Sequence, residues 1–319
     1  MLRVRIIMYH YVRDLRRSRY PAVKALDTML FRHQLDFLKS NFTLVRMEDV
    51  LLALQGDDLP GNAVLLTFDD GYSDHYSVVM PLLCEMNIYA AFFPSCMNLE
   101  TERLMDANKI HFILAAGDIR NVYEALLKEI EFYRGSEFDL PDTPALLQDY
   151  AVPGRFDCGE INFIKRMLQT VLPHKLRENI ADKLFRRFVG VDESVLSKEL
   201  YCDATQLADM KRRGMFIGLH GSCHGWLGNM EKTEYENDIL HALDYMDSIG
   251  LVDRRAWVMN YPYGSYSDGV VSYIQEHGCL AGLTTNVGIA DLHNDNRFLL
   301  PRLDTNDFPP KSEQYMRYM

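Results

Sequence analysis

The sequence lacks an excess of basic residues. It carries 34 Lys and Arg against 45 Asp and Glu, which gives a formal net charge of −11 at pH 7. Proteins that bind nucleic acid present basic faces to the phosphate backbone and release counterions from it. We therefore expect no nucleic-acid partner.

Cysteine is scarce and scattered. Six cysteines in 319 residues form no C-x-x-C pair and no dense, regular framework. Such a framework would indicate a disulfide scaffold or a thiolate zinc site. Reduced thiols are the expectation for all six: Cys84, Cys96, Cys158, Cys202, Cys223 and Cys279.

Long apolar runs are also missing. No stretch approaches the roughly 20 apolar residues of a membrane-spanning helix, so we expect no transmembrane segment. Residues 1–14 contain a short apolar run but neither the apolar core nor the small-residue cleavage site of a secretory signal. The expected location is cytoplasmic, and the sequence carries no indication of oligomeric state.

Hydrophobic residues, 48% of the chain, alternate between runs of strand length and segments of helical period. This alternation predicts an α/β fold with parallel strands. We expect strands at 3–8, 43–46, 63–68, 89–93, 215–219, 256–260 and 279–284. We expect helices at 29–40, 47–54, 73–86, 204–213, 231–247 and 267–277.

Residues 101–200 have a different pattern, because they are mostly helical in period, locally charged and without strand alternation. We predict a helical insertion within the same domain as residues 1–100 and 201–305, and a loosely held C-terminal tail at 306–319. Asp106 and His111 lie five residues apart in the insertion. A reach back to an active site and simple packing both remain open for them.

Two adjacent carboxylates, Asp69 and Asp70, stand where the apolar run 63–68 ends, and Gly71 follows them. Polar residues at the carboxyl ends of strands line the functional crevices of α/β folds. An Asp-Asp-Gly triplet alone is also common in ordinary turns. The pair therefore needs support from elsewhere in the chain.

That support comes from His220 and His224, four residues apart on a glycine-flanked turn after the run 215–219. Alone, they also fit two histidines that bind nothing. With one carboxylate of the Asp69–Asp70 pair they form a three-ligand set for a divalent cation, with positions left for water and substrate. No glutamate lies between the histidines to act as base, so the other carboxylate of the pair is the candidate that takes a proton from the attacking water.

A third group, Tyr261, Pro262 and Tyr263, follows the run 256–260 and precedes a glycine. Aromatic rings at a strand end can stack on a sugar face or form the wall of an acyl pocket, although the same residues also suit a plain turn.

Together these motifs resemble those of the polysaccharide deacetylase family, with its NodB-type homology domain. The resemblance covers most of residues 4–100 and 201–303 in the family order. Residues 67–72 resemble the first family motif, His220 to His224 with Leu227 the second, and residues 261–264 the third, while residues 8–10 and 81–83 are typical of one bacterial branch.

The resemblance implies a distorted (β/α)7 barrel with one divalent metal ion held by Asp70, His220 and His224. Zinc is the first expectation, and cobalt, nickel, iron or manganese also suit the ligands. It implies that Asp69 is the base and that the ion, with a backbone amide near Tyr72, stabilises the oxyanion. Substrate contacts are expected from Tyr72, Tyr261, Pro262 and Tyr263.

The implied activity is hydrolysis of an N-acetyl or similar N-acyl group from an amino sugar in polysaccharide or glycoconjugate metabolism. Without an export signal, a sugar-nucleotide or lipid-linked glycan intermediate is the favoured substrate. The alternatives are a deformylase or cyclic-amide hydrolase on the same fold, and a glycan-binding module without turnover. Intact Asp69 weighs against the binding module, which has no need of a spare base.

Two departures concern the residues around the base and the metal. Asn260 stands where many family members carry the arginine that orients the base, and Arg302 is our candidate replacement. Gly221 stands where the family usually has Ser or Thr, so we expect Ser222 to supply a hydrogen bond to the site instead.

The third departure concerns the general acid. The Leu-x-x-His motif that usually supplies it is absent near the C-terminus. We expect His10, at the end of the first strand, to protonate the leaving amine, with His293 as the alternative.

Overall fold

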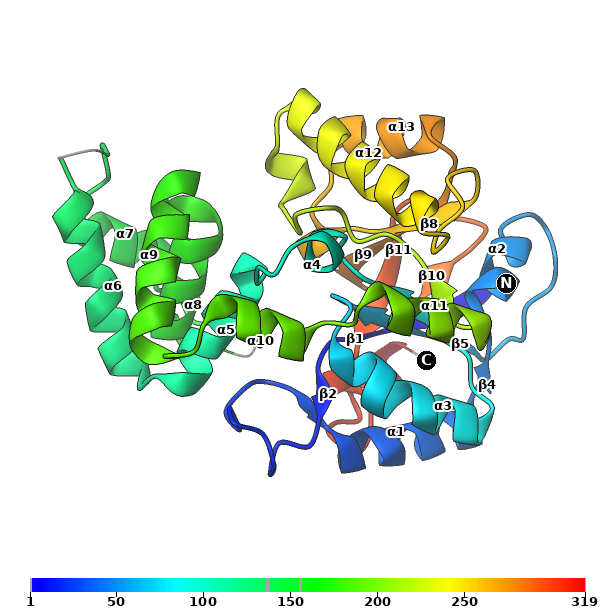
Figure 1. Cartoon of the computed structure of the whole chain (residues 1–319). Coiled ribbons are helices and arrows are strands. Elements are labelled where there is room, and N and C mark those ends of the chain that lie inside the picture. The colour runs from blue at the N-terminus through cyan, green and yellow to red at the C-terminus, as the bar shows by residue number, and fades with distance from the viewer. Residues whose placement is uncertain (1, 136–137, 155–156, 319) are drawn as a thin grey trace. The chain divides into compact units, whose positions relative to one another are not determined.

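The computed structural model describes residues 2–135, 138–154 and 157–318. These residues form two compact units (Figure 1). The first unit contains the described residues of 1–14, 25–102 and 197–319. The second contains 103–196 and also the short segment 15–24, which precedes the first long helix in the sequence.

The first unit is built on one curled sheet. Its main path runs β7-β6-β5-β1-β11-β9-β8, and every neighbouring pair on this path is parallel. Off the path, β4 pairs parallel with β5, and β10 pairs antiparallel with β1. The strands on the path are β1 (Arg3–Tyr9), β5 (Ala63–Asp69), β6 (Ala91–Phe93), β7 (Phe216–Ile217), β8 (Trp257–Asn260), β9 (Cys279–Val287) and β11 (Leu300–Asp304). The short strands β4 (Thr43–Leu44) and β10 (Ala290–Asp291) belong to the same sheet, whereas β2 (Val12–Arg13) and β3 (Leu26–Asp27) pair with each other in a separate two-stranded sheet.

The two ends of this path meet. A parallel bridge joins Leu219, just beyond β7, to Met259 in β8. Its hydrogen bonds run from Leu219 N to Val258 O at 3.0 Å and from Asn260 N to Leu219 O at 2.9 Å. The sheet thereby forms the distorted seven-stranded barrel that the sequence predicted.

The central strands are apolar because both of their faces are covered. Every residue of β5 is buried. In β1, Val4 and Ile6 belong to one hydrophobic cluster, while Ile7 and Tyr9 belong to the other. This division follows the two-residue period of a strand. A continuous apolar run is typical of a parallel strand buried on both faces.

The predicted helices of the first unit are present. They are α1 (Thr28–Asn41), α2 (Met47–Ala53), α3 (Met80–Met86), α11 (Ala204–Arg212), α12 (Lys232–Ser248) and α13 (Asp268–Glu276), with a short α4 (Met97–Glu100) in addition. The helix predicted at 73–86 begins instead as a π-helical turn, His75–Val79. Pro81 explains this widening, because proline has no N–H and its ring would clash with a carbonyl one α-helical turn earlier.

The tail predicted at 306–319 is not loose where the structure describes it. Gln34, buried on α1, donates from its amide to Thr305 O at 3.0 Å and Pro309 O at 3.1 Å. Phe308 is buried and its ring stacks on Tyr315 at 5.4 Å between centroids. These contacts fasten the segment to the core, which the polar and proline-rich sequence does not reveal.

The second unit is helical. Its helices are α5 (Asp106–Ala116), α6 (Ile119–Tyr133), α7 (Thr143–Tyr150), α8 (Gly159–Arg166) and α9 (His174–Phe188), and α10 (Glu193–Leu200) contains the boundary between the units. Lys109 is buried in this unit and pairs with Asp182 at 2.7 Å and Glu193 at 3.1 Å. Asp106 and His111 both lie on α5.

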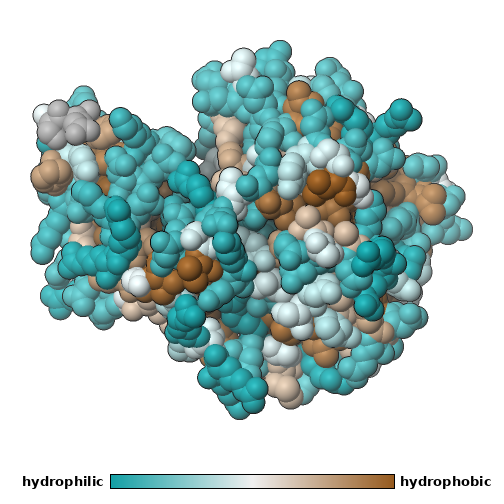
Figure 2. All heavy atoms as spheres, viewed as in Figure 1, coloured by the Kyte–Doolittle hydropathy of each residue, from teal (hydrophilic) through white to brown (hydrophobic). Residues whose placement is uncertain are grey.

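The surface is mainly polar on the face that Figure 2 shows, where hydrophobic residues gather in separate small areas. In the described part of the chain, no helix has the length and apolar character needed to cross a membrane. All six cysteines are free thiols, as predicted.

Candidate metal centre

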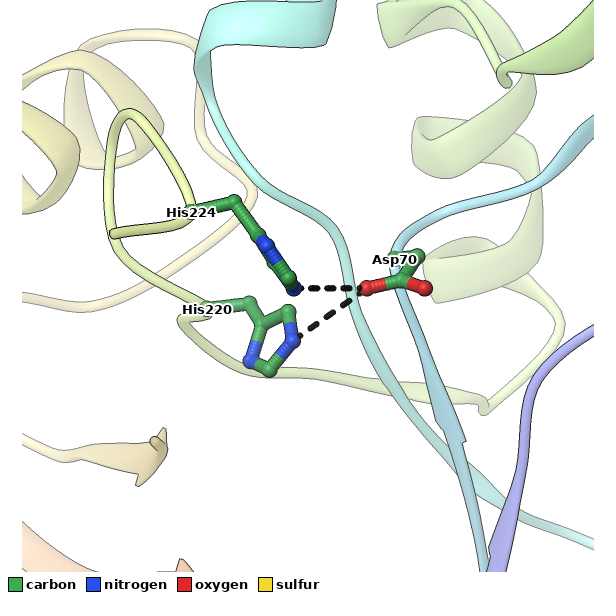
Figure 3. Close-up of side chains that lie close together, drawn as sticks. All are labelled: Asp70, His220 and His224. Carbon is green, nitrogen blue, oxygen red and sulfur yellow. Dashed lines mark ion pairs between the residues drawn. The ribbon is translucent and has the colours of Figure 1, made fainter. Parts of the chain in front are cut away.

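Three buried side chains converge at the carboxyl ends of the strands. Asp70 follows β5, and His220 and His224 lie on the loop after β7 (Figure 3). Their ligand atoms lie within 4.8 Å of one another. The structure therefore brings together the three residues expected to hold a metal.

The spacing of these atoms suits a divalent cation. Asp70 Oδ1 lies 3.3 Å from His220 Nε2 and 3.1 Å from His224 Nε2. Two ligands at about 2.1 Å from a tetrahedral ion are themselves about 3.4 Å apart. Asp70 Oδ1 is buried and accepts no hydrogen bond from the described residues. A carboxylate oxygen without a hydrogen bond, facing two imidazole nitrogens, is the donor set that such an ion needs.

Hydrogen bonds on the far side of each ligand set its direction. His220 Nδ1 donates to the backbone oxygen of Asn260 at 2.6 Å, which leaves Nε2 directed at the site. Tyr72 Oη donates to Asp70 Oδ2 at 2.5 Å, which leaves Oδ1 for the metal. Asp70 and Gly71 both have positive φ, and a Cβ on Gly71 would lie 2.6 Å from Pro94 Cβ. The tight turn therefore requires glycine at that position.

The charge of the triad is favourable for cation binding. Burial acts to raise the pKa of Asp70, but His224 and His220 outweigh it and hold that pKa well below its usual value. Burial and the Asp70 charge raise the pKa of Tyr72 well above its usual value. The phenol therefore stays protonated and donates to the carboxylate.

Asp69 is held beside the triad by two other side chains. Arg302 Nη1 and Nη2 donate to Asp69 Oδ1 and Oδ2, both at 2.8 Å. Asn260 Nδ2 donates to Oδ1 at 2.7 Å. Burial acts to raise the pKa of Asp69, but the Arg302 charge and hydrogen bonds, with help from nearby histidines, lower it overall. The carboxylate is therefore ionised at neutral pH.

Arg302 lies against the Asp69 carboxylate, as expected of a replacement for the family arginine. Its side chain is fully buried, and Nε donates to Thr284 O at 2.8 Å. Asn260 occupies the position where many family members carry the arginine, and its side-chain amide also donates a hydrogen bond to Asp69.

His10 lies close to Asp69, and His293 does not. His10 Nε2 is 3.8 Å from Asp69 Oδ2, and its side chain is 45% exposed. His293 follows β10, which pairs with Arg3 and Val4 at the amino end of β1. The seven residues of β1 span about 20 Å, so His293 is at the wrong end of the barrel for the general acid.

The loop that carries the two histidines is fastened by Asp238, a buried residue of α12. Its carboxylate accepts from Ser222 N at 2.9 Å and Cys223 N at 3.0 Å. Gly221 has φ 70°, and a Cβ there would lie 3.0 Å from Asp238 Oδ1. Gly221 therefore replaces the family Ser or Thr because the space is used by this carboxylate.

Among the described residues, the hydroxyl of Ser222 contacts Cys96 and not a residue of the triad, so the hydrogen bond expected from Ser222 to the site is not the one that the structure shows. Ser222 Oγ accepts from Cys96 Sγ at 3.2 Å, and Ser222 O accepts from Ser95 Oγ at 2.5 Å. The support for the histidine loop comes instead from Asp238, which accepts from the backbone amides of Ser222 and Cys223. The signal in the sequence is an Asp on the apolar stripe of α12, between Tyr235 and Ala242.

Replacing Asp238 with asparagine should weaken metal binding by about 10–100-fold, because the loop loses one of its fixed acceptors. Chelator competition on the full chain measures this affinity. Asp244→Asn is the matched control, since Asp244 lies on the same helix with a half-exposed side chain. Equal affinities in the two variants would contradict the positioning role of Asp238.

The aromatic group differs from the expectation. Tyr72 and Tyr261 are fully buried, and Tyr261 Oη donates to Phe298 O at 3.0 Å. Pro262 is buried as well. These three buried side chains belong to the core rather than to a substrate surface. The sequence analysis did not foresee this, because the pattern does not distinguish a buried ring from an exposed one.

Tyr263 is partly exposed and lies beside the triad. Its ring contacts His224 at 4.7 Å and stacks on Trp226 at 4.4 Å, with 7° between the planes. The sequence analysis missed Trp226, although its place two residues after His224 is a usable signal. Together Trp226 and Tyr263 form an aromatic pair at the metal centre.

Comparison with known proteins agrees with this geometry. The sequence profile of the family described as polysaccharide deacetylase matches residues 56–130 and 185–282, more than half of the chain. No curated protein matches the chain.

Several solved structures share the fold over nearly the whole chain. The Streptococcus pyogenes deacetylase PplD, solved with acetate, has a TM-score of 0.60 at 19% identity and covers 99% of this chain and 96% of its own. IcaB from Ammonifex degensii has a TM-score of 0.55 at 16% identity, covering 96% and 92%. The BpsB deacetylase domain from Bordetella bronchiseptica has 0.56 at 15%, covering 95% and 96%. With the curled barrel and the buried triad, the profile match places this chain in the polysaccharide deacetylase family.

Proposed function

We propose that the protein hydrolyses the N-acetyl group of an amino sugar in a glycan or glycan precursor. One observation carries the proposal: Asp69 is buried, ionised and held by Arg302 and Asn260 beside a metal triad of which it is not a member. A spare carboxylate in this position suits a general base. The family and the deacetylases that share the fold make acetyl the first acyl group to test.

Each residue then has a distinct role. Asp70, His220 and His224 would hold a divalent ion, which would supply Lewis-acid chemistry for the amide carbonyl. Asp69 takes the proton of the attacking water, and Arg302 keeps the carboxylate oriented. His10, half-exposed and 3.8 Å from Asp69, gives a proton to the leaving amine. These two transfers convert amide and water into amine and acetate.

The Trp226–Tyr263 pair supplies the substrate surface in this proposal. Two rings stacked at 4.4 Å present a rigid apolar face next to His224. Sugar rings carry apolar C–H faces that pack on aromatic rings, in the same way that other apolar groups do. The pair therefore positions the sugar whose acyl group reaches the triad.

Trp226→Ala should raise KM by about 5–30-fold, the equivalent of 1–2 kcal/mol of lost packing, with a smaller change in kcat. Steady-state kinetics on the best substrate found below measure the two constants. Trp226→Phe keeps part of the stack, so its KM should lie between those of the wild type and Trp226→Ala. A fall in kcat with KM unchanged would remove the pair from substrate binding.

The activity is tested by measuring acyl release from a panel of N-acetylated and N-formylated amino sugars with metal-loaded protein. The panel includes free oligosaccharides, sugar nucleotides and lipid-linked glycans, since the last two are the classes that the sequence analysis favours. Acetate release that His220→Ala abolishes supports the proposal. Faster formate release favours the deformylase alternative. If a panel member binds to the metal-loaded protein and no acyl group is released from it, the result favours a binding module.

A further inference from the structure

A second set of metal-binding side chains lies outside the triad. Cys96 Sγ, Glu100 and His241 offer ligand atoms within 4.8 Å of one another. Cys96 immediately precedes α4 and Glu100 ends it, four residues later, so one helical turn brings them to the same side. His241 reaches them from α12. The catalytic proposal uses none of the three.

Glu100 is the centre of this group. Its Oε2 accepts from Cys96 Sγ at 3.4 Å and contacts His241 Nε2 at 2.7 Å. The separation of 3.4 Å is close to that between two ligands of one tetrahedral ion. The separation of 2.7 Å is a hydrogen-bond distance, and it must lengthen when an ion takes the place of the shared proton. The site is closed at one end and open at the other, because Cys96 is fully buried whereas the His241 side chain is 56% exposed. An ion can therefore enter from the His241 side.

We propose that Cys96, Glu100 and His241 bind a thiophilic divalent cation of the Zn²⁺ class, at a site separate from the triad. Thiolate, imidazole and carboxylate together suit zinc, cadmium and cobalt, and a sulfur ligand disfavours magnesium and calcium. Three protein ligands leave a position for water, as expected for an exchangeable ion.

Binding at this site displaces a proton from Cys96. Without an ion, the Cys96 thiol keeps its proton and donates to Glu100 Oε2 at 3.4 Å. The incoming cation takes the place of that proton, which passes to solvent. The bonds that change are therefore S–H, which breaks, and the bond from sulfur to the ion, which forms.

The second site is attached to the loop that carries the triad histidines. Cys96 N donates to Gly221 O at 3.3 Å, Met97 N donates to Ser222 O at 3.0 Å, and Cys96 Sγ contacts Ser222 Oγ at 3.2 Å. The second site therefore contacts the loop that carries the triad histidines, although the two sites use different ligands.

Titration of the full chain with Co²⁺ tests the proposal. The triad has no sulfur ligand, so thiolate-to-cobalt charge-transfer absorption in the near ultraviolet reports the second site alone. We expect this band in the wild type, with two ions bound per chain. Cys96→Ser should lose the band and one ion. His220→Ala should keep the band and lose the other ion.

Cys84→Ser and Cys223→Ser are the matched controls, since both cysteines are exposed and lie outside the proposed ligand set. Both should keep the band. His241→Gln, at an exposed position, gives an independent test if Cys96→Ser folds poorly, and it should weaken the second ion at least tenfold. Absence of the band from the wild type, or a band that follows Cys223 instead of Cys96, would overturn the proposal.

Discussion

Arg302→Met is expected to lower the free energy of unfolding by about 3–5 kcal/mol, because it leaves the buried Asp69 charge without its main partner. The guanidinium makes two 2.8 Å hydrogen bonds to that carboxylate and is itself fully buried. Urea denaturation of the metal-free protein at neutral pH measures the change. Arg302→Lys should recover part of it, since one ammonium cannot reproduce the planar fork.

The sign of the pH dependence follows from the lowered pKa of Asp69. The stabilisation by Arg302 is fully present above the ordinary carboxyl pKa and is lost as pH falls through the lower pKa of the folded state. Arg254→Met is the control, because Arg254 and its partner Asp244 both have half-exposed side chains. It should cost less than 1 kcal/mol. Equal losses in the two variants would contradict the importance of the buried pair.

Asp69→Asn is expected to lower kcat by about 10²–10⁴-fold while the metal content stays unchanged, because we propose Asp69 as the base and not as a ligand. Asparagine has nearly the same shape but cannot take the proton. Metal analysis and acyl-release kinetics on the same preparation separate the two effects.

Asp70→Asn provides the contrast for this prediction. Asp70 Oδ1 faces both histidines, so its loss should reduce metal content and activity together. If Asp69→Asn instead loses its metal and keeps full activity per bound ion, Asp69 is a ligand and the proposed division of roles fails.

The sequence predicts the barrel and its metal centre well because both depend on local patterns. The strands β1 and β5 are short apolar runs, and burial on both faces requires that composition. The triad is predictable because Asp70 directly follows a strand and the two histidines share one turn. The family resemblance then supplies their order and roles.

Features that depend on distant contacts were not predictable. Asp238 is one of several acidic residues in α12, and only the folded loop reveals that its carboxylate accepts from two backbone amides. The burial of Tyr261, the orientation of Ser222 and the fastened C-terminal segment likewise depend on what the rest of the chain places around them. Residues 15–24 join the helical unit although a long stretch of the barrel separates them from it in sequence.

The closure of the barrel has a consequence for how the protein opens. The bridge between Leu219 and Met259 is short, and His220 follows it directly. A short run of ladder hydrogen bonds offers little resistance to local opening. His220 Nδ1 already donates to Asn260 O, at the end of β8, at 2.6 Å. An ion held by His220, His224 and Asp70 would join this histidine loop to the end of β5 and so restrict its movement away from β8. Metal binding should therefore slow amide hydrogen exchange at Leu219 and Asn260, the two amides whose hydrogen bonds cross this seam.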